Sequence, residues 1–193
     1  MNLIIESSNW HHSPVHRFLP GNTYMVTGAT LNKQHLFTEN EKLKAMRRVL
    51  FDAVSDYGWG LDAYSLFSNH YHFVGYTRGN SGSLSRLIQY FHSESAKALN
   101  LMDSKKGRRV WYQYWDKCLT YEASYYARLN CVNNNPVRHG LVPVASQYPF
   151  CSAPEFERCP AVFQRKLKSF KYDRLKVPDG FEVLWEGGGR CRG

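Results

Sequence analysis

The chain has 193 residues and a formal net charge of +9, from 25 lysines and arginines against 16 acidic residues, so it is long enough for one domain and favours a polyanionic partner such as nucleic acid. Five cysteines, an odd total with no Cys-x-x-Cys pair, argue against a zinc ribbon and a full disulfide framework and are typical of a reducing cytoplasm. No apolar run approaches the ~20 residues that a transmembrane helix needs, so we expect a soluble protein that does not bind membranes.

The first half of the chain predicts one helix among three strands. Residues 1–20 are polar and contain two prolines, which indicates an irregular leader. β-Branched and aromatic residues over 23–30 predict the first strand. Apolar residues at helical spacing predict a helix over about 41–57. Two further strands are expected over 61–67 and 71–76, joined by a tight turn.

The next stretch predicts two helices with a strand between them. Ser83 is expected to cap a long helix that carries one apolar stripe. A basic loop over 105–109 leads into an aromatic strand over 110–119. A last helix is predicted from Glu122 to about Asn134, and Pro136 ends it because the residue before a proline is disfavoured in helical conformation.

The order of these elements, β-α-β-β-α-β-α, indicates the fold class. It predicts an α+β protein with a ferredoxin-like split βαβ antiparallel sheet, helices on one face, and one added C-terminal helix. After Pro160 the sequence is basic and we expect it to be irregular. We therefore divide the chain into a leader (1–20), a domain (21–155) and a basic C-terminal extension (156–193).

Two histidines at the start of the third strand suggest a metal site. Residues i and i+2 of a strand point to the same face, so His70 and His72 can both reach one ion. A helix turns ~100° per residue, so Arg128, Cys131 and Asn135 line one face of the last helix. The amide oxygen of Asn135 could then complete the site. Two imidazoles and one oxygen would leave positions on Mg²⁺ or Mn²⁺ for phosphate and water.

Several segments together resemble a known family. His70-Tyr71-His72 resembles the HUH motif, histidine-hydrophobe-histidine, and Asn135–Val142 resembles the signature that follows the catalytic helix of REP-associated tyrosine transposases, within the single-tyrosine HUH transposases. Three shorter elements of that family also have counterparts: Val110-Trp111, Trp115-Asp116 and Tyr148-Pro149-Phe150-Cys151-Ser152. The resemblance extends from about Pro20 to Ala153.

This resemblance implies a DNA transposase that binds single-stranded or hairpin DNA. In the family, a divalent ion held by the two histidines activates a backbone phosphate, and a tyrosine of the last helix attacks it to form a 5′-phosphotyrosine link. That tyrosine lies four residues before the asparagine of Asn-Pro, a position occupied here by Cys131. A thiol is several ångströms shorter than a phenol, so we expect cleavage to be impaired, whether the replacement is natural or engineered.

Two alternatives remain open from the sequence. One is a non-catalytic protein that binds single-stranded DNA on the same scaffold, and the other is a metal-dependent nuclease in which the histidines activate water. In each case we expect a monomer or homodimer near the bacterial nucleoid. Six basic residues are candidates for DNA contact: Lys105, Lys106, Arg108, Arg109, Arg128 and Arg138.

Overall fold

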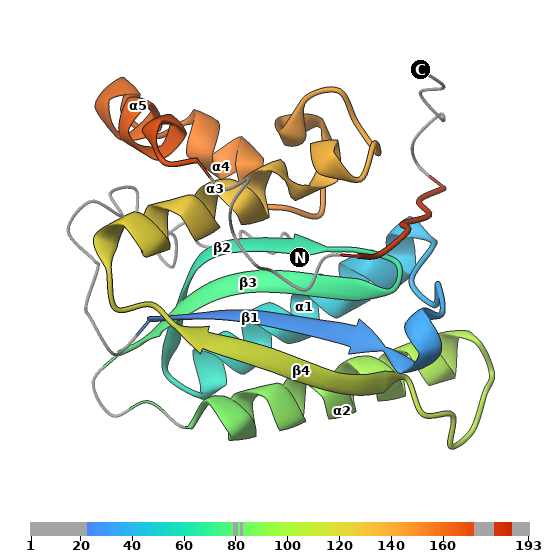
Figure 1. Ribbon diagram of the computed structural model, residues 1–193. Coiled ribbons are helices and arrows are strands. Elements are labelled where there is room, and N and C mark those ends of the chain that lie inside the picture. Colours follow the sequence, from blue (N-terminus) through green and yellow to red (C-terminus); the bar gives the residue numbers. More distant parts are fainter. Residues whose placement is uncertain (1–22, 79–80, 82, 172–179, 187–193) are drawn as a thin grey trace, which may run out of the picture.

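A four-stranded antiparallel sheet forms the centre of the molecule (Figure 1). A computed structural model describes residues 23–78, 81, 83–171 and 180–186; the expected leader 1–20 lies outside these ranges. Neighbouring strands follow the order β2-β3-β1-β4. The strands are β1 (Thr23–Thr30), β2 (Trp59–Leu66), β3 (His70–Thr77) and β4 (Trp111–Cys118). This arrangement confirms the predicted α+β class and the split βαβ order of the elements.

Helices cover both faces of this sheet. The helices are α1 (Asn40–Asp56), α2 (Leu84–Met102), α3 (Glu122–Arg138), α4 (Ala153–Glu157) and α5 (Ala161–Ser169), with 3-10 turns η3 (Leu31–Lys33) and η4 (Ala145–Gln147). In Figure 1, α1 and α2 lie on one side of the sheet and α3, α4 and α5 on the other. The paired helices α1 and α2 are those predicted on one face, and α3 is the added helix.

Alternation along the strands divides the core between these two layers. Tyr71 and Phe73 point to the α1 and α2 side and join the larger apolar cluster. Val74 points to the other side, where Leu129 and Val132 of α3 are buried in a second cluster. Because successive strand residues alternate between faces, His70 and His72 lie on the same face as Val74. The two histidines therefore face the side of the sheet that α3 covers.

The third helix is longer than the sequence predicts. We expected it to end near Asn134, but α3 continues through Pro136 to Arg138. A proline inside a helix removes the N–H that would bond the carbonyl four residues earlier, here that of Val132. The Ser65 hydroxyl of β2 donates to that carbonyl at 2.7 Å instead. A hydrogen bond from the sheet thus replaces the missing helical one, and the prediction of the helix end was wrong.

The region after Pro160 is also more ordered than predicted, because it contains α5. Phe163 and Leu167 of α5 are buried against Tyr126 of α3 in the second apolar cluster. Their spacing of four residues places both on one helical face. The many basic residues of this segment led to the prediction of irregular structure, but the segment forms a short amphipathic helix. This helix packs on the outer side of α3.

Candidate metal and DNA site

The two histidines of the HUH motif lie side by side at the start of β3. His70 is paired with Ala29 of β1, and His72 is paired with Thr27, two residues along the same strand. Their ring centroids are 5.0 Å apart, with the ring planes at 75°. Both side chains are fully buried. The predicted convergence of the two imidazoles on one face is therefore present in the structure.

Hydrogen bonds fix the orientation of the first ring. Asn69 donates through Nδ2 to the backbone oxygens of Lys33 at 3.3 Å and Glu182 at 2.8 Å, so its Oδ1 faces His70. This oxygen lies 2.9 Å from His70 Nδ1 and can only accept, so Nδ1 carries the proton. The lone pair of His70 is therefore on Nε2.

The second ring is held in the same way from a neighbouring strand. Thr27 Oγ1 lies 2.7 Å from His72 Nδ1. Metal-binding histidines usually donate a hydrogen bond from the ring nitrogen that does not touch the metal. Asn69 and Thr27 are suited to this role, which leaves Nε2 of both rings as the atoms that can bind an ion. The sequence motif did not identify Thr27, because its contact with His72 depends on the strand register. Asn69 directly precedes His70, but its orientation depends on the distant backbone oxygens of Lys33 and Glu182.

The third predicted ligand, Asn135, is buried near the same histidines. Neither its Oδ1 nor its Nδ2 has a hydrogen-bond partner among the described residues. His139, one helical turn after Asn135, has its ring centroid 5.1 Å from that of His70. Because residues i and i+4 share a helical face, Asn135 lies on the flank of α3 that faces His70. A buried amide without partners is costly unless it binds a ligand.

This combination of donor atoms fits a divalent ion. Two imidazole nitrogens and one amide oxygen would form one side of a coordination sphere, and phosphate oxygens or water would complete it. Among the residues that the structure describes, no group of three or more histidine, cysteine, aspartate or glutamate side chains could hold a metal. Cys131 therefore does not join the two histidines in a ligand set, and the oxygen of Asn135 remains the candidate third ligand.

Cys131 lies on α3 beside two arginines. Its side chain is fully buried, and Arg138 Nη1 donates to its sulfur at 3.3 Å. Arg128 is also largely buried and donates to the backbone oxygen of Ser124 at 3.2 Å. Burial lowers the pKa of Arg128, and the nearby Cys131 acts in the opposite direction. The position predicted from the resemblance to hold the attacking residue is thus next to positive charge that suits a phosphate.

Comparison with solved structures identifies the fold. A REP-associated tyrosine transposase bound to a REP hairpin superposes with a TM-score of 0.59 at 18% sequence identity, covering 91% of this chain and 95% of that chain. This chain has the fold of a REP-associated tyrosine transposase. A candidate transposase from Deinococcus radiodurans matches over 58% of this chain and 88% of that chain, with a TM-score of 0.43 and 15% identity. No family model and no curated protein matches the sequence.

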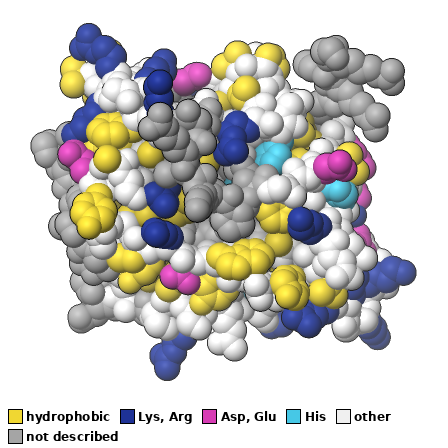
Figure 2. Space-filling view, viewed as in Figure 1, with side chains coloured by type: hydrophobic (Ala, Val, Ile, Leu, Met, Phe, Trp, Pro, Cys, Tyr) yellow, Lys and Arg dark blue, Asp and Glu magenta, His cyan; other side chains and the backbone are white. Residues whose placement is uncertain are grey.

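Within this transposase fold, the predicted DNA-contact residues of the loop before β4 differ in their surroundings. Lys105, Lys106 and Arg109 are exposed. Arg108 instead bonds Asp103 at 2.6 Å and the Asn100 side chain at 2.9 Å, so it holds the loop to the end of α2. Figure 2 shows Lys and Arg side chains on the face that α3 covers, some of them beside a histidine. A role of these residues in DNA binding stays a prediction.

A C-terminal strap over residues 180–186 is a feature of the site that the sequence did not predict. Phe181 stacks on His70 with ring centroids 4.2 Å apart and planes at 12°. Its neighbours hold the strap: Leu184 N donates to Ser68 Oγ at 3.2 Å, and the Trp185 ring contacts Tyr148 at 4.9 Å. Figure 1 shows the strap beside the end of the sheet where β3 begins. The available signal was a group of four large apolar residues in this tail, Phe181, Val183, Leu184 and Trp185.

None of the described helices is sufficiently long and apolar to cross a lipid bilayer.

Proposed function

We propose that this protein binds single-stranded or hairpin DNA and positions one backbone phosphate over a divalent ion held by His70, His72 and Asn135. The observation that carries the proposal is the buried amide of Asn135, without a described partner, on the flank of α3 that faces two anchored imidazoles. The REP-associated transposase with the same fold was solved with a REP hairpin, which supports a DNA ligand of this kind.

Each part of the proposed site has a distinct task. An ion of the Mg²⁺ or Mn²⁺ type would polarise the phosphate and stabilise the charge that develops on its oxygens. His70 and His72 would present their Nε2 atoms in a fixed orientation because Asn69 and Thr27 hold the opposite ring nitrogens. Arg138, beside Cys131, would bind the same phosphate from the helix side.

We propose that this chain binds DNA but cleaves it poorly. Cys131 occupies the place of the attacking tyrosine, and its short side chain is fully buried beneath Arg138. A nucleophile that is held back from the phosphate loses most of the advantage of correct positioning. This burial favours the second candidate function, a DNA-binding protein without cleavage on the transposase scaffold.

The decisive experiment compares the chain with its Cys131→Tyr variant. Each is incubated with end-labelled hairpin DNA and Mg²⁺ or Mn²⁺, and covalent protein–DNA complexes are detected after denaturation. We expect both proteins to bind the hairpin and only the tyrosine variant to form the covalent complex. His70→Ala in the tyrosine background is the control, and it should abolish the complex.

Other outcomes would change the assignment. A covalent complex with both proteins would mean that a residue other than position 131, or the thiol itself, attacks the phosphate. Repeated release of 5′-phosphate products without a covalent complex would favour the nuclease that activates water. Absence of DNA binding in both proteins would overturn the proposed function.

We further propose that residues 21–155 form the DNA-binding domain and 156–193 its extension, in a protein of the bacterial cytoplasm that works at the nucleoid as a monomer or homodimer. The match to one transposase chain covers 91% of this chain, which supports one continuous unit.

A further inference from the structure

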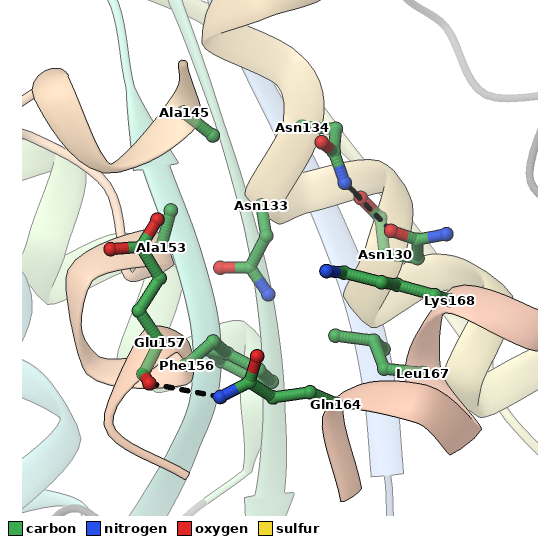
Figure 3. A pocket seen from close by; sticks show the side chains of 10 residues that line it. All are labelled: Asn130, Asn133, Asn134, Ala145, Ala153, Phe156, Glu157, Gln164, Leu167 and Lys168. Atoms are coloured by element: carbon green, nitrogen blue, oxygen red, sulfur yellow. Dashed lines mark hydrogen bonds between the residues drawn. The ribbon is translucent and has the colours of Figure 1, made fainter. Parts of the chain in front are cut away.

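A cavity of about 340 Å³ lies on the flank of α3 that faces away from the candidate metal site. Asn133 lines it, and two residues further along the helix correspond to a rotation of ~200°, so Asn133 and Asn135 point to nearly opposite sides. The other walls come from η4, α4 and α5 (Figure 3). Ten residues line the cavity: Asn130, Asn133, Asn134, Ala145, Ala153, Phe156, Glu157, Gln164, Leu167 and Lys168.

The floor of this cavity is apolar, and a fixed acceptor lies above it. Phe156 and Leu167 are buried, and Ala153 leaves space beside them. Gln164 donates through Nε2 to the backbone oxygens of Glu157 and Cys159, both at 2.9 Å. Both amide protons of Gln164 are thereby used, so its Oε1 faces the cavity as an acceptor, as Figure 3 shows.

The deeper amides are also held in place. Asn133 donates to the Leu129 backbone oxygen at 2.9 Å and accepts from the Ser152 hydroxyl at 2.7 Å. Asn134 donates to the side-chain oxygen of Asn130 at 2.6 Å and to its backbone oxygen at 2.9 Å. The amide wall is therefore organised before any ligand enters, which reduces the entropy that binding would cost.

Opposite charges stand on the two sides of the opening. In Figure 3 the carboxylate of Glu157 lies on one side and the ammonium group of Lys168 on the other. Both residues are exposed, and neither has an ion-pair partner among the described residues. A ligand with hydrogen-bond donors on one edge and acceptors on the other would match this arrangement.

We propose that this cavity binds an unpaired guanine base. Guanine is planar, so its faces suit the apolar floor, and a volume near 300 Å³ is sufficient for one small ligand. The adjacent N1–H and N2–H groups would donate to Glu157, with Gln164 Oε1 as a further acceptor. Lys168 would donate to O6 and N7, the atoms that lysine and arginine recognise in guanine. Adenine lacks the paired donors, and thymine has only one.

The base can come from two sources, a DNA strand or a free nucleotide. The DNA source rests on the proposed function, because the strand would then be the one held at the histidine site. Single-stranded nucleic acid is commonly recognised through unstacked bases in this manner. The two sources share the guanine ring, and they are separated by testing each one alone.

The first test uses mononucleotides and the full chain. Guanosine, inosine and adenosine 5′-monophosphates are titrated into the protein while binding is followed by equilibrium dialysis. We expect guanosine monophosphate to bind at least about tenfold more tightly than the other two, because inosine lacks the N2 amine. Glu157→Gln should remove this preference, whereas Glu41→Gln, an exposed carboxylate on α1, should retain it. Equal binding of the three nucleotides would overturn the proposal.

The second test uses hairpins that carry one unpaired guanine or one unpaired adenine. We expect tighter binding of the guanine hairpin, and Ala145→Leu, which fills the cavity from η4, should reduce it to the adenine level without changing the adenine hairpin. Equal binding of both hairpins by the unchanged protein would overturn the DNA source while leaving the proposed function intact. Glu157-dependent binding of guanosine monophosphate without any hairpin binding would support the cavity and refute the proposed function.

Discussion

Two side chains outside the His70-Tyr71-His72 motif determine which nitrogen of each histidine would face the proposed ion. Thr27, on β1, holds His72 through Nδ1 at 2.7 Å. Thr27→Val removes the hydroxyl at nearly constant volume, so we expect the affinity for Mn²⁺ to fall by about 10-fold or more, as is typical when such a partner is lost. Free Mn²⁺ can be measured by electron paramagnetic resonance during a titration. Thr27→Ser keeps the hydroxyl and should bind as the unchanged protein does; an equal loss in both variants would contradict this role.

A buried histidine on the opposite face of the sheet predicts a pH dependence of stability. His92 of α2 stacks on Trp111 at 4.7 Å and lies 2.8 Å from the Tyr71 hydroxyl. Burial lowers its pKa from 6.5 to about 3. Below about pH 6.5, His92 takes up a proton in the unfolded chain but not in the folded chain. The free energy of unfolding is therefore unaffected by His92 above this pH and decreases by about 1.4 kcal/mol per pH unit below it.

Urea unfolding at pH 7.5 and pH 5.0 measures this contribution. The unchanged protein should lose about 2 kcal/mol more than His92→Phe between the two values, because the phenylalanine variant has no group to protonate there. The contribution of the carboxylates to the pH dependence is the same in both proteins, so it is absent from the difference between them. Parallel pH profiles for the two proteins would show that His92 does not titrate in this way.

The sequence predicted the placement of some candidate site residues and not of others, for identifiable physical reasons. The shared face of His70 and His72 could be predicted because strand alternation depends only on local spacing. The helical face of Asn135 could be predicted because the helical repeat relates it to its neighbours on the same helix. Thr27 could not be predicted, since its hydrogen bond to His72 joins β1 and β3 and spans 45 residues. The orientation of Asn69 could not be predicted either, since its amide donates to the backbone oxygens of Lys33 and Glu182, which only the fold brings close.

At the scale of elements, α3 shows where local rules failed. A proline near a helix end is a strong signal to stop, but this signal assumes that the freed carbonyl finds no other donor. Ser65 supplies that donor from β2. The same hydrogen bond joins α3 to β2 beside His72, because Ser65 and His72 are paired in the sheet. The helix that carries Asn135 is thus fixed to β2, the strand paired with the one that carries the histidines.

A double-mutant cycle tests this hydrogen bond between β2 and α3. Ser65→Ala leaves the carbonyl of Val132 buried without a donor and should cost about 1–3 kcal/mol of unfolding free energy. Pro136→Ala restores a backbone N–H that can bond the same carbonyl. We therefore expect Ser65→Ala to cost about 1 kcal/mol less in the Pro136→Ala background than alone, measured by guanidinium unfolding. Strictly additive effects would show that Ser65 and Pro136 do not serve the same carbonyl.

At the scale of the molecule, the basic loop before β4 and the histidine site lie at the same end of the sheet. β4 begins at Trp111, which is paired with Thr30, and β3 begins at His70, which is paired with Ala29. Composition predicted a polyanionic partner, because charge is additive along the sequence. Composition did not predict the strap that covers His70, since the contact of Phe181 with β3 joins segments more than 100 residues apart.

The salt dependence of hairpin binding tests whether this loop contacts DNA. Each phosphate contact adds about 0.7–0.9 to the slope of log K against log salt concentration. If Lys105 and Lys106 each bind one phosphate, replacing both with alanine should reduce the slope by about 1.4–1.8. Lys44→Ala with Arg48→Ala removes the same charge from exposed positions on α1, on the face of the sheet that is turned away from the histidine site. Equal slopes for the two double variants would mean that net charge alone, and not the loop, sets the affinity; a smaller slope only for the loop variant would locate the DNA backbone at this end of the sheet.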